Sequence, residues 1–141
     1  MRHEVSTPID APAELVWQTI TAVEKWPEWT PTMTEIRRLD DGELRVGSKA
    51  EVRQPKQPVR TWTVTELTPG TSFTWVTSGT GLQLSADHVI RTDERGAVVA
   101  ELTFTARGVL APVAGLLAGK AVRAAVDTEA SSLKKWCESH G

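Results

Sequence analysis

The last third of the chain contains the only segment long enough for a helix of several turns, from about Val109 to Trp136. Pro112 lies near its start, where a missing backbone N–H is harmless, and no further proline interrupts the segment. Apolar residues recur there at helical spacing: Ala118, Val122, Val126, Ala130, Leu133, Trp136 and Cys137. The opposite face carries charged residues: Lys120, Arg123, Asp127, Glu129, Lys134 and Lys135. Because the preceding segments have the pattern of strands, we expect a sheet that wraps around this helix.

Two glycines, Gly115 and Gly119, lie one turn apart in the first half of this helix. Glycine costs about 1 kcal/mol relative to alanine inside a helix, so its presence needs a compensating reason. Small residues at these positions indicate that something approaches the helix closely. Two alternatives remain open, namely a ligand and the backbone of another segment.

The N-terminal part of the chain predicts one strand followed by two short helices. Residues 3–9 alternate loosely as a strand, and a helix follows with Asp10 as its N-cap and Pro12 at an early helical position. That helix ends near residues 21–22. The next stretch, Trp26-Pro27-Glu28-Trp29-Thr30-Pro31, contains two prolines and therefore predicts a single helical turn. We expect Trp29 to be largely buried, because the prolines on both sides fix its backbone.

From Met33 onward the hydrophobic pattern has a period of two, with turn-forming segments at regular spacing. Turns or loops are predicted at 40–43, 54–58, 68–71, 78–81 and 93–96, and strands at about 33–39, 45–53, 59–67, 72–77, 82–91 and 97–106. Short connections make sequential strands antiparallel neighbours. With the first strand, they predict an α+β fold: a curved seven-stranded antiparallel sheet around the C-terminal helix, in a single domain spanning 1–141.

Several local patterns accompany this order of elements. They are Ile9-Asp10-Ala11-Pro12, Val16-Trp17, the 26–31 stretch, Val46-Gly47, Trp62 before Thr68-Pro69-Gly70, and Phe73-Thr74-Trp75. With them, the whole chain resembles the SRPBCC or START-like (Bet v 1-like) superfamily, specifically its polyketide cyclase/dehydrase branch. The resemblance implies a helix-grip fold with a cavity between the concave face of the sheet and the long helix.

The alternation of the strands identifies side chains that would face this cavity. Apolar and small residues are frequent among them, as in ligand pockets, which are mostly apolar with a few polar groups. The candidate ligand-binding residues are Val52, Trp62, Trp75, Leu84, Ala86, His88, Leu102, Phe104, Gly115 and Gly119. The alternative is that the tryptophans, of which the chain has 6, fill the space.

His88 is the one titratable residue predicted in the middle of the apolar face, where burial disfavours its charged form. It is a candidate for a hydrogen bond to a ligand or for a general base; the alternative is a core histidine satisfied by backbone or water. Asp87 cannot orient it, because adjacent strand residues point to opposite faces. Arg60 and Glu66 lie at strand ends, and either surround the mouth of the cavity or are solvated charges.

No other pattern specific for catalysis or cofactor binding is present. The sequence lacks a metal-spaced His/Cys cluster, a Gly-x-Ser-x-Gly elbow, a phosphate loop and a dinucleotide fingerprint. We therefore expect no metal and no cofactor, and we assign no catalytic residue. The net charge of −2, with acids and bases interspersed, does not favour a nucleic-acid partner. The single cysteine, Cys137, excludes an internal disulfide and indicates a small buried side chain in a reducing compartment.

Residues 1–4 lack the apolar region of a signal peptide, and the longest apolar run, 109–119, is too short to span a bilayer. We expect a cytoplasmic monomer or homodimer without stable membrane insertion. The first functional hypothesis is the binding of a small hydrophobic or aromatic molecule, lipid-like or polyketide-like. The second is a polyketide cyclase or dehydratase that uses His88. The third is an interaction protein related to stress or to toxin–antitoxin systems.

Overall fold

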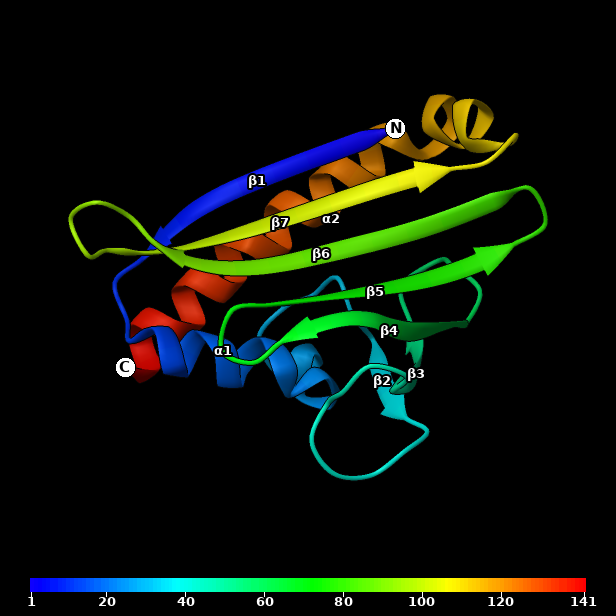
Figure 1. The fold of residues 1–141 in the computed structure, drawn as a ribbon. Coiled ribbons are helices and arrows are strands. Elements are labelled where there is room, and N and C mark those ends of the chain that lie inside the picture. The colour runs from blue at the N-terminus through cyan, green and yellow to red at the C-terminus, as the bar shows by residue number, and fades with distance from the viewer.

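A curved antiparallel sheet closes around one long helix in the computed structural model, which describes all residues from Met1 to Gly141 (Figure 1). The strands are β1 (Arg2–Ile9), β2 (Glu35–Arg38), β3 (Lys49–Arg53), β4 (Arg60–Thr68), β5 (Ser72–Gly79), β6 (Leu82–Thr92) and β7 (Val98–Arg107). The helices are α1 (Ala13–Thr21), the 3₁₀ helix η1 (Val23–Glu28) and α2 (Ala111–His140). The sheet order is β1-β7-β6-β5-β4-β3-β2, and every neighbouring pair is antiparallel. The predicted α+β helix-grip fold is confirmed.

Two strands are shorter than the sequence pattern predicts. Strand β2 begins at Glu35 and not at residue 33, and β3 begins at Lys49 and not at residue 45. The residues before β3 form a turn in which the N–H of Ser48 donates to the carbonyl of Arg45 at 2.9 Å. Gly47 in this turn has a φ of 94°, a left-handed conformation that glycine adopts at little cost. The prediction of a strand over 45–53 is therefore wrong for its first four residues.

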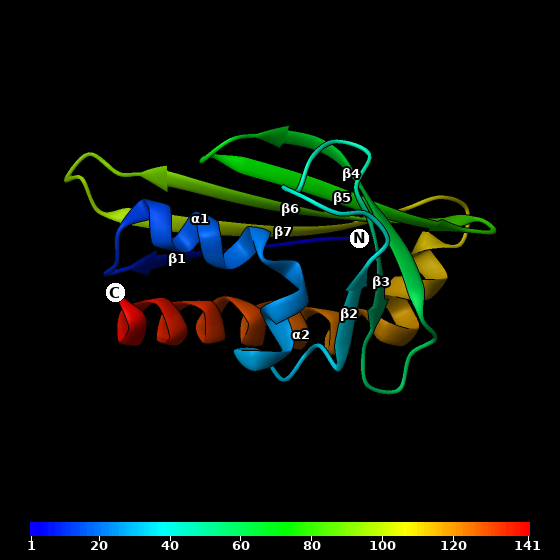
Figure 2. The same cartoon turned by 90° about the horizontal axis from the view of Figure 1, so that it is seen from below.

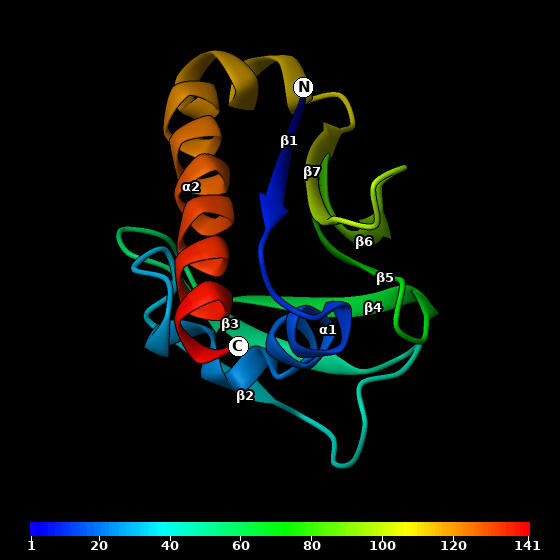
Figure 3. The ribbon, with the colours of Figure 1, turned by 90° about the vertical axis from the view of Figure 1, so that its left-hand side faces the viewer.

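The sheet is curved so that its concave face surrounds one side of α2 (Figures 2 and 3). The pairing of β4 with β5 contains a register shift between Val64 and Glu66. An irregularity of this kind bends a strand and increases its twist. The bend helps to bring β2 and β3 round toward the helix, which lies beside the concave face in Figure 3.

The register of the strands aligns the large inward-facing side chains. Two rows cross β5, β6 and β7: Trp75–Ala86–Phe104 and Phe73–His88–Leu102. Since alternate residues of a strand share one face, both rows point to the concave side of the sheet, which α1, η1 and α2 cover. The middle of the concave face is therefore apolar, with one histidine in it.

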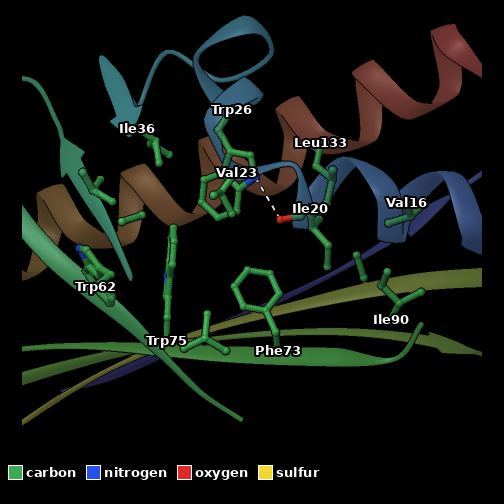
Figure 4. Packing of buried hydrophobic residues seen from close by; sticks show 14 of the residues in the cluster. Val16, Ile20, Val23, Trp26, Ile36, Trp62, Phe73, Trp75, Ile90 and Leu133 are labelled. Carbon is green, nitrogen blue, oxygen red and sulfur yellow. Dashed lines mark hydrogen bonds between the residues drawn. The ribbon is translucent and has the colours of Figure 1, made fainter. Parts of the chain in front are cut away.

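The hydrophobic core lies between the sheet and the α1–η1 segment (Figure 4). Its largest buried side chain is Trp26 of η1, which is 1% exposed and whose Nε1 donates to the carbonyl of Ile20 at 3.2 Å. Trp29 is of intermediate exposure and packs against this core, with its Nε1 buried, so the expectation that it is largely buried stays a prediction. Residues three apart lie on the same side of a 3₁₀ helix. Val23 and Trp26 occupy the inner positions of that row, and Trp29 lies just beyond its end.

Asp10 does not cap α1, contrary to the sequence prediction. Pro12 occupies the N-cap position, and no side chain caps this helix end. Asp10 and Ala11 form a bend between β1 and the helix, so Asp10 lies two residues before the N-cap position. Its backbone N–H instead donates to Glu138 Oε2 at 2.9 Å, which ties the end of β1 to the last turns of α2.

The two halves of α2 have different surroundings. In the second half Ala130, Leu133 and Cys137 are buried, and Cys137 Sγ lies 3.7 Å from Thr19 Oγ1 of α1. The first turns of α2 are bent away from the axis of the rest of this helix (Figure 3). Exposed apolar residues gather at this end: Val109, Leu110, Val113, Leu116 and Leu117. Neither α2 nor any other helix combines the length and apolar composition that a membrane span requires.

The turn between β5 and β6 is fastened to the start of α2. The N–H of Leu110 donates to the carbonyl of Gly81 at 2.8 Å. Gly108 has a φ of +110°, and a Cβ atom at this position would lie 2.5 Å from the oxygen of Gly81. The two segments therefore approach so closely that only glycine fits at position 108.

We expect Gly108→Ala to lower the free energy of unfolding by about 2 kcal/mol, because a left-handed conformation and a collision with backbone act together. Gly96→Ala is the matched control, since Gly96 has a φ of +82° and no other group within 4 Å of the added Cβ. This control should lose only about 1 kcal/mol. Urea unfolding of both variants measures the difference, and equal losses would contradict the close contact.

Candidate ligand-binding site

A cavity of about 530 Å³ lies between the concave face of the sheet and α2. Hydrophobic residues make up 18 of the 29 that line it. Strands β3 to β7, η1 and α2 supply the walls, and the exposed loop 54–58 lies at the edge. A mostly apolar space of several hundred Å³ is typical of small-molecule sites.

Nine of the ten residues that the sequence predicts for the site line this cavity: Val52, Trp62, Trp75, Leu84, Ala86, His88, Leu102, Phe104 and Gly115. Gly119 does not line it. A Cβ atom on Gly119 would face Met1 Sδ at 3.9 Å and the guanidinium of Arg123 at 3.8 Å. A Cβ atom on Gly115 would lie 3.5 Å from the Cβ of Met1. The segment that approaches both glycines is thus the N-terminal residue, at ordinary contact distances.

The tryptophans form one wall of the cavity and do not fill it, so that alternative is wrong. The ring centroids of Trp62 and Trp75 are 5.7 Å apart, and those of Trp26 and Trp75 are 5.3 Å apart. Tilted arrangements at such distances are favourable for aromatic pairs. Figure 4 shows Trp62 and Trp75 side by side on the sheet, with Trp26 above them on η1. The remaining walls come from β6, β7 and α2.

His88 is 3% exposed and is bound through only one of its ring nitrogens. Its Nδ1 lies 3.2 Å from the carbonyl oxygen of Phe73. Because a carbonyl can only accept, Nδ1 carries the hydrogen, and Nε2 of the neutral ring has a free lone pair. The ring stacks on Phe73 with centroids 4.2 Å apart. Burial lowers the pKa of His88 to about 4, although the Phe73 carbonyl and the charge of Asp87 raise it.

Glu129 of α2 also lines the cavity and is partly buried, although the sequence pattern places it on the charged face of the helix. It forms neither a hydrogen bond nor an ion pair, and burial raises the pKa of its carboxyl to about 7. The signal in the sequence was its spacing, since it follows Val122 by seven residues and Val126 by three. Both valines line the cavity.

Two cations, Arg60 and Lys56, line the cavity, and so does Asp87, whose carboxylate accepts a hydrogen bond from Thr74 Oγ1 at 2.6 Å. Arg60 makes no ion pair, and its Nε is buried without a hydrogen-bond partner. Glu66, the other charge that the sequence places near the mouth, is exposed and takes no part in the lining. The structure contains no group of three or more His, Cys, Asp or Glu residues arranged to hold a metal ion.

The sheet, the long helix and the space between them define a helix-grip protein with an internal cavity. A family model described as polyketide cyclase/dehydrase and lipid transport matches residues 2–138. The chain therefore belongs to this family. No significantly similar protein is found among curated proteins.

Solved structures with the same fold are distant in sequence. A hypothetical protein from Helicobacter pylori is 13% identical, with a TM-score of 0.79, and the match covers 96% of this chain and 86% of the other. The di-domain ARO/CYC protein BexL from the BE-7585A biosynthetic pathway is 18% identical, with a TM-score of 0.74, and the match covers 96% of this chain and 45% of BexL. A protein from Nitrosospira multiformis is 13% identical, with a TM-score of 0.70, and the match covers 94% of this chain and 96% of the other. At these identities the likeness shows the fold alone.

Proposed function

We propose that this protein binds a small hydrophobic or aromatic molecule, lipid-like or polyketide-like, in its internal cavity. The observation that carries the proposal is the apolar cavity of about 530 Å³, left open beside three tryptophans that pack on one another. Empty apolar space in a core is destabilising, because its walls lose contacts that a packed side chain would make. A ligand that fills the space restores those contacts.

A second candidate is an enzyme that catalyses cyclisation or dehydration of such a molecule. The presence of His88 and Glu129 in the same cavity favours it, because a neutral imidazole with a free lone pair accepts a proton. Glu129, with a pKa of about 7, exists in both protonation states near neutral pH. Family membership alone is compatible with either binding or catalysis. Conversion of a bound compound to a product of different mass would favour the enzyme.

We expect flat aromatic compounds or fatty acids to change the tryptophan emission when they enter the cavity, with an affinity that is roughly micromolar, or about −8 kcal/mol. Trp62 and Trp75 line the site, so the change should shrink in the double variant Trp62→Phe/Trp75→Phe. Trp26 also lines the cavity and leaves a residual signal. Fluorescence titration measures the change.

Trp136→Phe is the control for this titration, since Trp136 stacks on His140 near the end of α2 and takes no part in the lining. It should leave the emission change intact. A signal that is unchanged in the double variant would place the bound compound elsewhere. Native mass spectrometry of the freshly purified protein tests the same proposal independently, by detecting a retained small molecule.

A further inference from the structure

Four side chains that line the cavity carry polar atoms without a hydrogen-bond partner: Arg60 and Trp62, whose buried Nε and Nε1 atoms are donors, and His88 and Glu129, which can accept. The two acceptors face the cavity from different elements. His88 stands on β6, in the sheet, and Glu129 stands on α2, which covers the sheet. The lining residues around Glu129 on its own helix are apolar: Val122, Ala125 and Val126. Polar groups buried among apolar ones are normally hydrogen-bonded, and leaving them unpaired costs free energy. A ligand that supplies both missing bonds is therefore favoured over one that supplies neither.

The chemistry of His88 restricts the first of these bonds. Its Nδ1 hydrogen is directed to the carbonyl of Phe73, so Nε2 is an acceptor only. A hydroxyl or an N–H satisfies it, whereas a carbonyl, an ether or a carboxylate does not. The ligand must therefore carry a hydrogen-bond donor.

The charges near the cavity restrict the second bond. A carboxylate ligand that reaches Glu129 would repel its carboxyl once both groups were ionised, whereas one that stays beside Arg60 or Lys56 at the edge would leave His88 and Glu129 without a partner. An ammonium ligand would pass the cations Lys56 and Arg60 at the edge. A neutral hydroxyl avoids both conflicts, because it can donate to a carboxylate and can accept from a carboxylic acid.

We propose that His88 and Glu129 form a recognition pair for hydroxyl groups, so that the cavity selects hydroxylated aromatic molecules over hydrocarbons, fatty acids and amines. This inference rests on the proposed binding function and goes beyond it by naming the functional group that is recognised. It adds Glu129 to the site and gives His88 a defined role, that of an acceptor at Nε2.

The test uses four probes that share one ring system: naphthalene, 2-naphthol, 2-naphthoate and 2-(aminomethyl)naphthalene. Calorimetric titration of the full chain at neutral pH gives the four affinities. A good hydrogen bond to a buried partner corresponds to about a tenfold gain in affinity. We expect 2-naphthol to bind about tenfold more tightly than naphthalene, and the naphthoate and the amine to bind more weakly than 2-naphthol.

The variants Glu129→Leu and His88→Leu should each reduce the preference for 2-naphthol over naphthalene toward unity. Glu129→Gln keeps hydrogen-bonding capacity and should retain part of the preference, which separates recognition from a general loss of folding. Glu14→Leu, at an exposed position of α1, is the matched control and should leave the preference unchanged. Thermal melting of each variant confirms that it is folded.

The possible failures are distinguishable. If naphthalene and 2-naphthol bind with equal affinity, the recognition pair is refuted and the binding function stands. If the amine binds most tightly, Glu129 acts as a counter-ion and the inference is refuted. If none of the four probes binds, both the proposed function and this inference fall.

Discussion

Replacing Trp26 with alanine is expected to lower the free energy of unfolding by about 3–5 kcal/mol, the usual cost of truncating a buried tryptophan. The Trp26 side chain is 1% exposed, and its ring centroid lies 5.3 Å from that of Trp75 and 5.5 Å from that of His88. It connects η1 to the centre of the sheet. Its removal also leaves the Ile20 carbonyl without the indole N–H that now donates to it.

Urea unfolding followed by circular dichroism measures the loss, since the fluorescence of the remaining tryptophans is itself altered by the change. Trp29→Ala is the matched control from the same short segment, and it should cost less because Trp29 is only partly buried. Trp26→Phe keeps most of the packing and loses the hydrogen bond, so an intermediate loss is expected. A loss below about 1 kcal/mol for Trp26→Ala would contradict its central place in the core.

Glu129→Gln is expected to stabilise the protein in a pH-dependent way. Below about pH 4.5 the carboxyl is protonated in both the folded and the unfolded chain, so the two proteins should differ little. Between pH 4.5 and 7 the unfolded chain ionises while the folded chain keeps the proton, which favours unfolding of the wild type. Above pH 7 the penalty is constant. A difference between pKa values of 4.5 and about 7 corresponds to about 3 kcal/mol, which is an upper bound here because the Glu129 side chain is partly exposed to solvent.

The measurement is the unfolding free energy of both proteins at pH 4 and at pH 8. The gain from Glu129→Gln should be larger at pH 8 than at pH 4, by up to about 3 kcal/mol. His88, with a pKa of about 4, titrates equally in both proteins and cancels in the comparison. Glu14→Gln, at an exposed position, should give the same difference at both pH values. A gain from Glu129→Gln that does not vary with pH would show that the carboxyl is solvated.

The sheet and its inward face were predictable because two independent signals agreed. Alternation along β5, where Phe73 and Trp75 are buried and Thr74 is not, coincides with turn residues at both ends. Before β3 these two signals disagree: residues 45–48 continue the alternation of a strand, whereas Gly47 forms a turn. Alternation alone cannot distinguish a strand from a turn that happens to have the same pattern.

The polar part of the site was only half predictable. His88 is conspicuous because it interrupts an apolar row of a strand, whereas Glu129 lies among other charged residues along a helix. The hydrophobic stripe of α2 marks the side chains that pack in the core, such as Leu133 and Cys137. A helix that borders a cavity also has a row of residues that line the cavity, next to the row that packs in the core. The cavity-lining row need not be apolar, so hydrophobic periodicity does not reveal it. That Trp26 is buried more deeply than Trp29 was not predictable, since two prolines fix the backbone without fixing which tryptophan is directed inward.

The pairing of the first strand with the last has a consequence for the order in which the chain folds. Strands β3 to β7 pair with their sequential neighbours, and short connections close with little loss of entropy. The start of the chain must find a partner much farther away, since the N-terminal amine donates to the carbonyl of Ala106 across 105 positions. Contacts of such long range slow folding. The hairpins are thus expected to assemble first, and β1 to join β7 in a late step that completes the wall on which α2 docks.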